Sequence, residues 1–221
     1  GPGGPRIHLG PTVTHNSAVA STLLEERGYP LVLACWQVGT PQLRNRGTIA
    51  GNLITASPAN DTIAALWALD ARLTLSSVEG QRELSFADFY QGVRQTDLAP
   101  DEMVTDISFP ALGQNQRGTF VKLALRRVHA ISVVNAAAVL TFDDEIVAEA
   151  RITMGSVAPT VIRAREAESA LVGRKLSQES IDKAAELAGK ATSCIDDIRA
   201  RGDYRREVIS VLVHRALASL R

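Results

Sequence analysis

Residues 44–62 of the chain, RNRGTIAGNLITASPANDT, bring glycine, asparagine, proline and hydroxyl side chains together in a stretch that we expect to be neither helix nor regular strand. An apolar helical pattern, LVLACWQVG, precedes this stretch, and a second one, TIAALWALDA, follows it with Asp61 as the expected N-cap. The polar stretch is therefore predicted to be a long loop whose two ends are held by helices. Any fold for this chain has to satisfy that constraint.

The segments around this loop predict two α+β units in series. Before the loop, RIHLGPTVT is typical of a strand and a turn, and HNSAVASTLLEER is typical of a single amphipathic helix. After the loop, RLTLSSVEGQRELS predicts a hairpin turned at Glu79-Gly80, and FADFYQG predicts a short helix. EMVTDISFP then predicts a strand that ends at Pro110.

The polar, glycine-flanked segment LGQNQRG, residues 112–118, is the predicted boundary between the two units. Three strand-like runs follow it, with a turn at Asp143-Asp144, and three helices complete the chain. The second of these helices begins with a capping box formed by Ser177 and Ser180. We therefore expect a scar or linker at residues 1–5, a first domain at residues 6–113 and a second domain at residues 114–221.

Composition excludes several classes of protein. With 221 residues, 45% of them hydrophobic, the chain can bury a core. Its 24 Lys and Arg balance 24 Asp and Glu, and no basic stripe is interleaved with aromatics, so nucleic acid is not an expected partner. Cys35 and Cys194 lack metal-ligand spacing, so we expect no metal site and a reducing compartment. No apolar run reaches the roughly 20 residues that span a bilayer, and we expect a cytoplasmic protein.

The polar loop has the chemistry of an anion or sugar site. Glycine at positions 47 and 51 would let the backbone N–H groups approach a phosphate. Hydroxyl, amide and carboxylate groups would supply directed hydrogen bonds. The spacing matches neither GxGxxG nor GxxxxGK[ST]. The residues alone leave a second interpretation open, in which the loop is an internally satisfied turn. The candidate ligand-binding side chains are Thr48, Asn52, Thr55, Ser57 and Asp61.

The segment WQVGTPQLRNRGTIAGNLITASPANDTIAALWALDA resembles the flavin-binding signature of the FAD-binding medium subunits of molybdenum hydroxylases, the family of the carbon monoxide dehydrogenase medium subunit and the xanthine dehydrogenase FAD domain. FVKLALRR resembles the strand that brings a lysine to the flavin, here Lys122. DEMVTDISFP resembles the strand that lays an apolar residue on the adenine, here Val104. DYRREVISVLVHRAL resembles the last helix of the family, so the resemblance extends from residue 6 to residue 221.

This resemblance implies the second lobe of a vanillyl-alcohol-oxidase-type FAD-binding domain, followed by a small C-terminal domain of sheet and helices. Thr48, Gly51 and Asn52 would contact the diphosphate and ribityl groups, and Thr55, Ser57 and Asp61 would continue along the cofactor. Lys122 and the segment 123–133 would lie near the isoalloxazine. Ala50 replaces the first of two adjacent glycines in the relatives, which tightens the loop.

The family further implies a hetero-oligomer, in which a molybdopterin subunit oxidises the substrate and an iron–sulfur subunit relays electrons to the FAD held by this chain. Relatives carry a first lobe, with an AGGTDL-like turn, upstream of the point where this chain begins. We expect that lobe to be supplied by other residues or to have been removed by truncation. Two alternatives are a scaffold that keeps the fold without FAD, and a site for a different nucleotide.

Four other assignments rest on the residues themselves. Trp36 and Trp67 lie on apolar helix faces and are expected in the core. His15 has no metal partner by spacing and is expected to be structural or exposed. The arginine-rich segment 201–206 is expected to be a solvated helix start paired with acidic neighbours.

Overall fold

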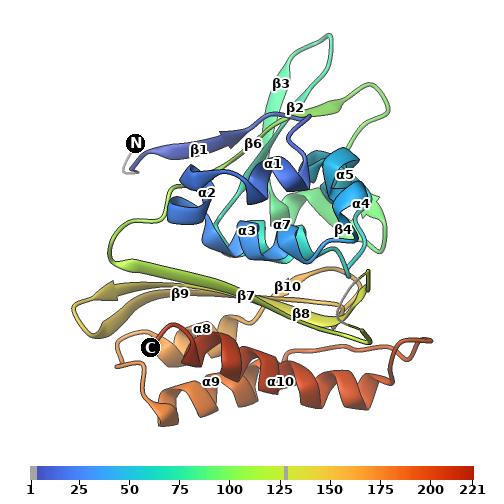
Figure 1. Ribbon diagram of the computed structural model, residues 1–221. Helices are drawn as coiled ribbons and strands as arrows, with labels where there is room; N and C mark the ends of the chain where they lie inside the picture. The colour runs from blue at the N-terminus through green and yellow to red at the C-terminus, as the bar shows by residue number, and fades with distance from the viewer. Residues whose placement is uncertain (1–3, 127–128) are drawn as a thin grey trace.

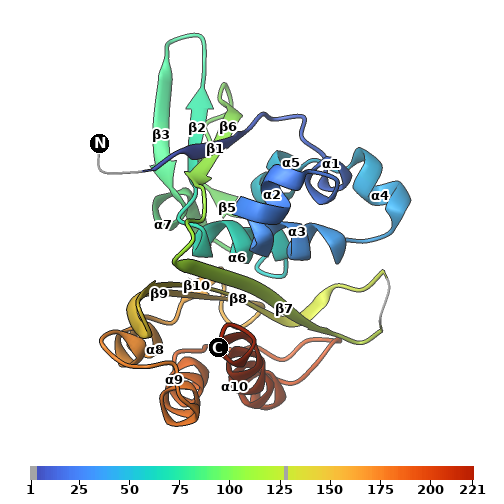
Figure 2. The same ribbon diagram turned by 60° about the vertical axis from the view of Figure 1, so that its left-hand side comes forward.

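The computed structural model describes residues 4–126 and 129–221. The described residues form two four-stranded sheets and one two-stranded sheet, and helices pack beside the first four-stranded sheet and on both faces of the second (Figure 1). The first sheet is antiparallel in the order β1-β6-β2-β3, and its β2–β3 hairpin projects away from the rest of the molecule (Figure 2). This hairpin confirms the predicted turn at Glu79-Gly80. The strands are β1 (Arg6–Leu9), β2 (Arg72–Ser76), β3 (Gln81–Ser85) and β6 (Met103–Pro110).

Short helices and a small ribbon complete the N-terminal half. The single helix expected over residues 15–27 is wrong, because two helices separate at Ala20 and Ser21. The Ser21 hydroxyl accepts a hydrogen bond from the Leu24 N–H and so begins a new helix. The elements are α1 (His15–Val19), α2 (Thr22–Arg27), α3 (Tyr29–Trp36), α4 (Pro41–Arg46), α5 (Ile49–Ile54), α6 (Asp61–Ala68), α7 (Phe86–Phe89), β4 (Tyr90–Gly92) and β5 (Gln95–Thr96).

The C-terminal half is an antiparallel sheet in the order β10-β9-β8-β7 with three helices on one face. The predicted capping box of Ser177 and Ser180 is confirmed at the start of α9. The turn between β8 and β9 contains Asp144, whose φ of 51° lies in the left-handed region that aspartate tolerates. The elements are β7 (Gln116–Ala124), β8 (Ser132–Asp143), β9 (Ile146–Gly155), β10 (Ile162–Arg163), α8 (Arg165–Leu171), α9 (Gln178–Lys190) and α10 (Gly202–Ala218).

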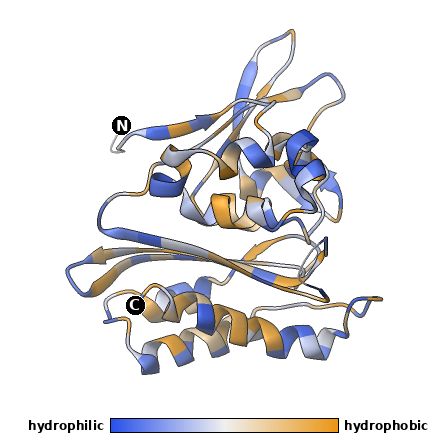
Figure 3. Ribbon diagram, viewed as in Figure 1, coloured by the Kyte–Doolittle hydropathy of each residue, from blue (hydrophilic) through white to orange (hydrophobic). Residues whose placement is uncertain are grey.

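Strand β8 is buried on both faces. Ala137 and Val139 belong to the core of the N-terminal half, whereas Ala136 and Ala138 belong to the core beneath α9 and α10. Because side chains of a strand alternate between faces, one apolar strand supplies both cores. Colouring by hydropathy shows apolar residues on the inward sides of the neighbouring helices (Figure 3). The second sheet is therefore shared by the two halves of the molecule.

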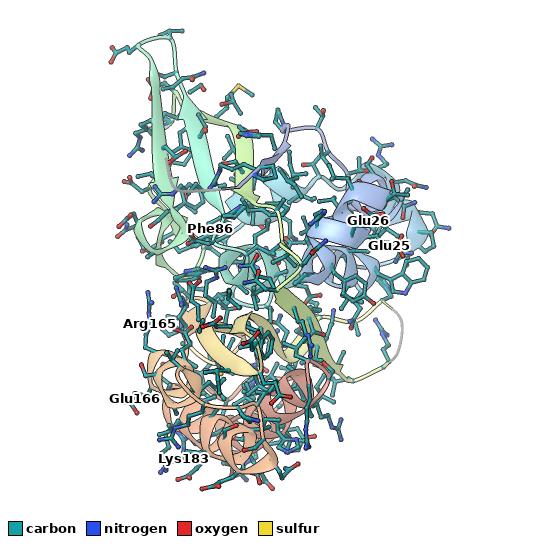
Figure 4. The ribbon with its side chains drawn as sticks, turned by 90° about the vertical axis from the view of Figure 1, so that its left-hand side faces the viewer. Glu25, Glu26, Phe86, Arg165, Glu166 and Lys183 are labelled. Carbon is teal, nitrogen blue, oxygen red and sulfur yellow. The ribbon has the colours of Figure 1, made fainter. Side chains whose placement is uncertain are left out.

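Charged side chains surround these cores. Glu25 and Glu26 lie on α2 and Lys183 lies on α9, all three exposed, whereas Phe86 is buried inside the N-terminal half (Figure 4). Two of the earlier expectations are wrong. Trp36 is 60% exposed, and Arg205, expected at a solvated helix start, is only 1% exposed. No helix within residues 4–126 and 129–221 combines the length and the hydropathy needed to cross a membrane.

Candidate functional site

The polar stretch 44–62 is not a continuous loop, which corrects the first prediction: α5 lies within it. Thr48 is the N-cap of α5, and its Oγ1 accepts a hydrogen bond from the Gly51 N–H at 3.0 Å. Ile49, Ala50 and Leu53 then face the core. A capping threonine followed by apolar residues at helical spacing is therefore sufficient to form a short helix despite the glycine.

The turn that follows α5 folds back onto this helix. The Asn52 carbonyl accepts hydrogen bonds from the Asn60 amide at 2.6 Å and from the Thr55 hydroxyl at 2.8 Å. Asn60 is the N-cap residue of α6, and Asp61 is its first residue, so the expected N-cap at Asp61 is wrong by one position. The Ser57 hydroxyl accepts from the Ala59 N–H at 3.3 Å. The turn thus satisfies part of its own hydrogen-bonding capacity.

Asp61 forms a buried ion pair with Lys122 that joins α6 to β7. The Lys122 ammonium donates to Asp61 Oδ2 at 2.6 Å, and the exposed fractions of the two side chains are 6% and 5%. On the other carboxylate oxygen, the Ser132 hydroxyl donates at 2.6 Å and the Asn135 amide donates at 2.9 Å. Burial raises the pKa of Asp61, and its bonds to Lys122, Ser132 and Asn135 oppose that rise.

Asn135 is not among the residues predicted for the site, and Ser132 is included only as part of the segment 123–133. Both lie on β8 and are fully buried. The signal in the sequence is two polar residues inside the otherwise apolar run SVVNAAAVL. Buried polar side chains require partners, and here the partner is the carboxylate of α6.

A second set of hydrogen bonds holds the turn between α3 and α4. Arg44 donates to the carbonyl oxygens of Trp36 at 3.1 Å and Val38 at 3.2 Å. Lys122 donates to the intervening carbonyl of Gln37 at 3.3 Å. The Arg44 guanidinium also lies over the exposed Trp36 ring, 5.0 Å from its centroid, and so gives it a cation–π contact.

These elements line an open cavity of about 600 Å³ between α5, the turn after it and β7. Of the predicted site residues, Asn52, Thr55, Ser57, Asp61 and Lys122 line it. Thr48 and Gly51 lie at the first turn of α5, outside that lining. Val104 lies apart from all of them, on β6, where its side chain is buried in the core of the N-terminal half.

The segment after Lys122 borders a neighbouring cavity of about 650 Å³, lined in part by Trp36, Arg44, Arg126 and His129. Lys122 contributes to both cavities. Within the segment 123–133, Arg127 and Val128 lie outside the described residues.

Comparison with known proteins agrees with this architecture. Residues 3–112 match the FAD binding domain in molybdopterin dehydrogenase, and residues 119–220 match the CO dehydrogenase flavoprotein C-terminal domain. The nicotine 6-hydroxylase medium subunit of Paenarthrobacter nicotinovorans is 31% identical over 97% of this chain and 75% of its own length. The carbon monoxide dehydrogenase medium chain of Hydrogenophaga pseudoflava is 29% identical over 97% of this chain and 74% of its own length.

Solved structures give the same result. Carbon monoxide dehydrogenase from Hydrogenophaga pseudoflava superposes with a TM-score of 0.94 at 29% identity, over 98% of this chain and 75% of that chain. The fold expected from the resemblance, a mixed helix-and-sheet FAD-binding domain followed by a C-terminal domain, is confirmed. The chain therefore belongs to the family of FAD-binding medium subunits of molybdenum-containing hydroxylases, the oxidoreductase family that includes the carbon monoxide dehydrogenases.

Proposed function

We propose that this chain holds FAD and acts as the electron-transfer subunit of a molybdenum hydroxylase complex, passing electrons from an iron–sulfur subunit to an external acceptor. The observation that carries the proposal is the cavity beside α5, because the residues of the family signature line it together with the buried Lys122–Asp61 pair. A cavity of this size falls within the range typical of small-molecule and cofactor sites.

The residues present fit a cofactor with a polar chain. Asn52 Oδ1 accepts from the Thr62 hydroxyl, which orients the side chain, and its Nδ2 makes no hydrogen bond within the described residues. Asn52 lines the cavity, so this N–H₂ group can donate to a ligand there. Gly51 is exposed, and a Cβ there would meet only the Thr48 hydroxyl, at 3.0 Å. Glycine therefore keeps the first turn of α5 open to a close approach.

The proposal includes the FAD contacts that the family resemblance predicts. Thr48, Gly51 and Asn52 would hold the diphosphate and ribityl groups, and Thr55, Ser57 and Asp61 would continue along the cofactor. Lys122 would lie beside the isoalloxazine and stabilise negative charge there. Val104 would support the adenine from β6. Bound FAD would supply the redox chemistry, while the protein binds, orients and tunes it.

The proposal also names partners and a compartment. A molybdopterin subunit would oxidise the substrate, an iron–sulfur subunit would deliver electrons, and the complex would work in the cytoplasm. Relatives are called medium chains or medium subunits, which supports a place in a multi-subunit assembly.

The test is the FAD content of the protein purified with the polypeptides that accompany it. Asn52→Ala should weaken FAD binding about fivefold, because one hydrogen bond to the ligand is lost, and should destabilise the fold by only about 1 kcal/mol, because the Thr62 hydroxyl loses its acceptor. Asn115→Ala is the matched control, since Asn115 is an exposed asparagine whose amide donates to the Phe142 carbonyl near the end of β8. Wild-type protein without flavin absorption would favour a scaffold, and equal FAD content in both variants would remove Asn52 from the site.

A further inference from the structure

The first residues of β8 hold the Asp61 carboxylate. The Ser132 hydroxyl and the Asn135 amide both donate to Oδ1, at 2.6 and 2.9 Å, and the Asn135 amide also donates to the Ser132 hydroxyl at 3.3 Å. Lys122 occupies Oδ2. All of these donors are buried. The carboxylate is thus supplied with one charged and two neutral donors, which favour its ionised form.

The Asn135 amide directs its N–H₂ group toward Asp61, and this orientation leaves a buried acceptor without a partner among the described residues. Its Oδ1 has no hydrogen-bond partner within residues 4–126 and 129–221. A buried acceptor without a partner is unfavourable, and rotating the amide by half a turn would place this oxygen against the carboxylate. The orientation is therefore set by the need to donate to Asp61.

Ser132 is fixed from the opposite side. Its carbonyl accepts a hydrogen bond from Arg199 at 3.1 Å and from the Ser156 hydroxyl at 3.4 Å. Arg199 is itself paired with Asp197. The backbone of Ser132 is consequently anchored to the segment before α10, and its hydroxyl is presented to α6.

Few other charged or titratable groups face Asp61. Cys35 on α3 lies near it, and burial raises the pKa of this thiol, so the side chain stays neutral. Arg94 lines the same cavity from the turn between β4 and β5. Among the described residues that contact the carboxylate, Lys122 on β7 is the single cation. Burial raises the pKa of Asp61, and Lys122 and the two donors of β8 are the groups that oppose this rise.

We propose that Ser132 and Asn135 are positioning residues, which hold Asp61 as a carboxylate and through it hold the Lys122 ammonium at the wall of the cavity. The inference rests on the proposed function, because the group that Lys122 would face there is the flavin. Without these donors Asp61 takes up a proton from solvent at a higher pH. The ion pair is then lost, and Lys122 is free to leave the wall of the cavity.

The first experiment needs no cofactor. The protein is labelled with ¹³C-carboxyl aspartate, the Asp61 signal is assigned with Asp61→Asn, and its pH titration is recorded. Ser132→Ala and Asn135→Leu should each move the titration of Asp61 upward by about one to two pH units, since each removes one donor to a charged group. Thr153→Val is the control, because Thr153 is another buried hydroxyl of this sheet and bonds the Ala64 carbonyl of α6.

The second experiment measures FAD binding by the purified complex. The double variant Ser132→Ala/Asn135→Leu should bind FAD about tenfold more weakly than wild type, and Thr153→Val should match wild type. If the double variant does not fold, Ser132→Cys is used instead, because it keeps the volume and replaces the hydroxyl with a weak donor. The pH titration of Asp61 in that variant then tests the inference. Wild-type protein that binds no FAD would refute the proposed function but leave the titration decisive for positioning. If Asp61 titrates at the same pH in Ser132→Ala and Asn135→Leu as in Thr153→Val, the inference is overturned.

Discussion

Replacing Arg205 with methionine should lower the free energy of unfolding by about 1–5 kcal/mol. Arg205 lies in the first turn of α10, where its guanidinium donates to the carbonyl oxygens of Val133 at 2.9 Å and Ser156 at 3.0 Å. It also pairs with Asp197 at 2.5 Å. Methionine fills much of the same volume but provides no donor, so the substitution tests the hydrogen bonds rather than the packing.

The expected loss of unfolding free energy follows from the hydrogen bonds that the partners of Arg205 lose or keep. Two carbonyl oxygens at the ends of β8 and β9 lose this donor, and each unsatisfied buried group costs about 1–3 kcal/mol. Asp197 adds little, because its side chain is 22% exposed and keeps its pair with Arg199. Arg205 Nε has no partner within the described residues, so removing it offsets about 1 kcal/mol of the loss.

Urea denaturation followed by far-UV circular dichroism measures the effect. At about 2–3 kcal/mol per molar urea, the midpoint should fall by roughly 1 M. Arg206→Met is the matched control, because Arg206 is the next residue on α10 and is exposed, and it should change stability by less than about 0.5 kcal/mol. If the two variants unfold at the same urea concentration, the buried hydrogen bonds of Arg205 do not contribute as we argue.

Three further predictions concern individual residues. Lys122→Met should lower the reduction potential of bound FAD, because a positive charge beside the reduced flavin is lost, and a potential equal to or above wild type would contradict this role. Burial and Arg44 lower the pKa of His15 from 6.5 to about 4, so its contribution to stability is complete above pH 6.5 and decreases by about 3 kcal/mol as the pH falls to 4. His15→Gln should flatten the pH profile of unfolding over that interval, and an unchanged profile would exclude His15 as its source. A Cβ at Gly155 would lie 2.3 Å from Asn135 Oδ1 and 2.9 Å from the Pro58 carbonyl, so Gly155→Ala should lower the free energy of unfolding by about 1–3 kcal/mol. Gly189→Ala is the control, because Gly189 lies within helix α9 and its added Cβ would meet mainly the Ser210 hydroxyl, which can rotate away. Equal melting temperatures for the two alanine variants would show that the contact at Gly155 is not rigid.

Local patterns account for much of what the sequence predicts correctly. The capping box at Ser177, the hairpin at Glu79-Gly80 and the apolar run of β8 each depend on neighbouring residues, so they can be recognised in the sequence. The signature residues from Asn52 to Asp61 were identified by their resemblance to a family, and the structure brings them together with Lys122 at one cavity. Their contacts with FAD remain predictions.

Two of the errors originate in partners that lie far away in the sequence. Arg205 is buried because it meets carbonyls 72 and 49 residues away, and no local pattern distinguishes it from Arg206. Ser132 and Asn135 are likewise defined by a carboxylate more than 70 residues away. Trp36 was expected in the core because its helix is apolar, but the turn that follows leaves its ring at the surface beneath Arg44.

The sharing of β8 between two cores has a consequence for how the protein opens. An amide of β8 can exchange its hydrogen with solvent only when the strand separates from β7 or β9, and that separation disturbs the packing of α6 on one face and α10 on the other. The amides of β8 should therefore exchange most slowly, at a rate set by global unfolding. The two halves, which the sequence presents as successive units, should then melt in a single transition, and a cavity made on the α6 side should loosen α10 as well.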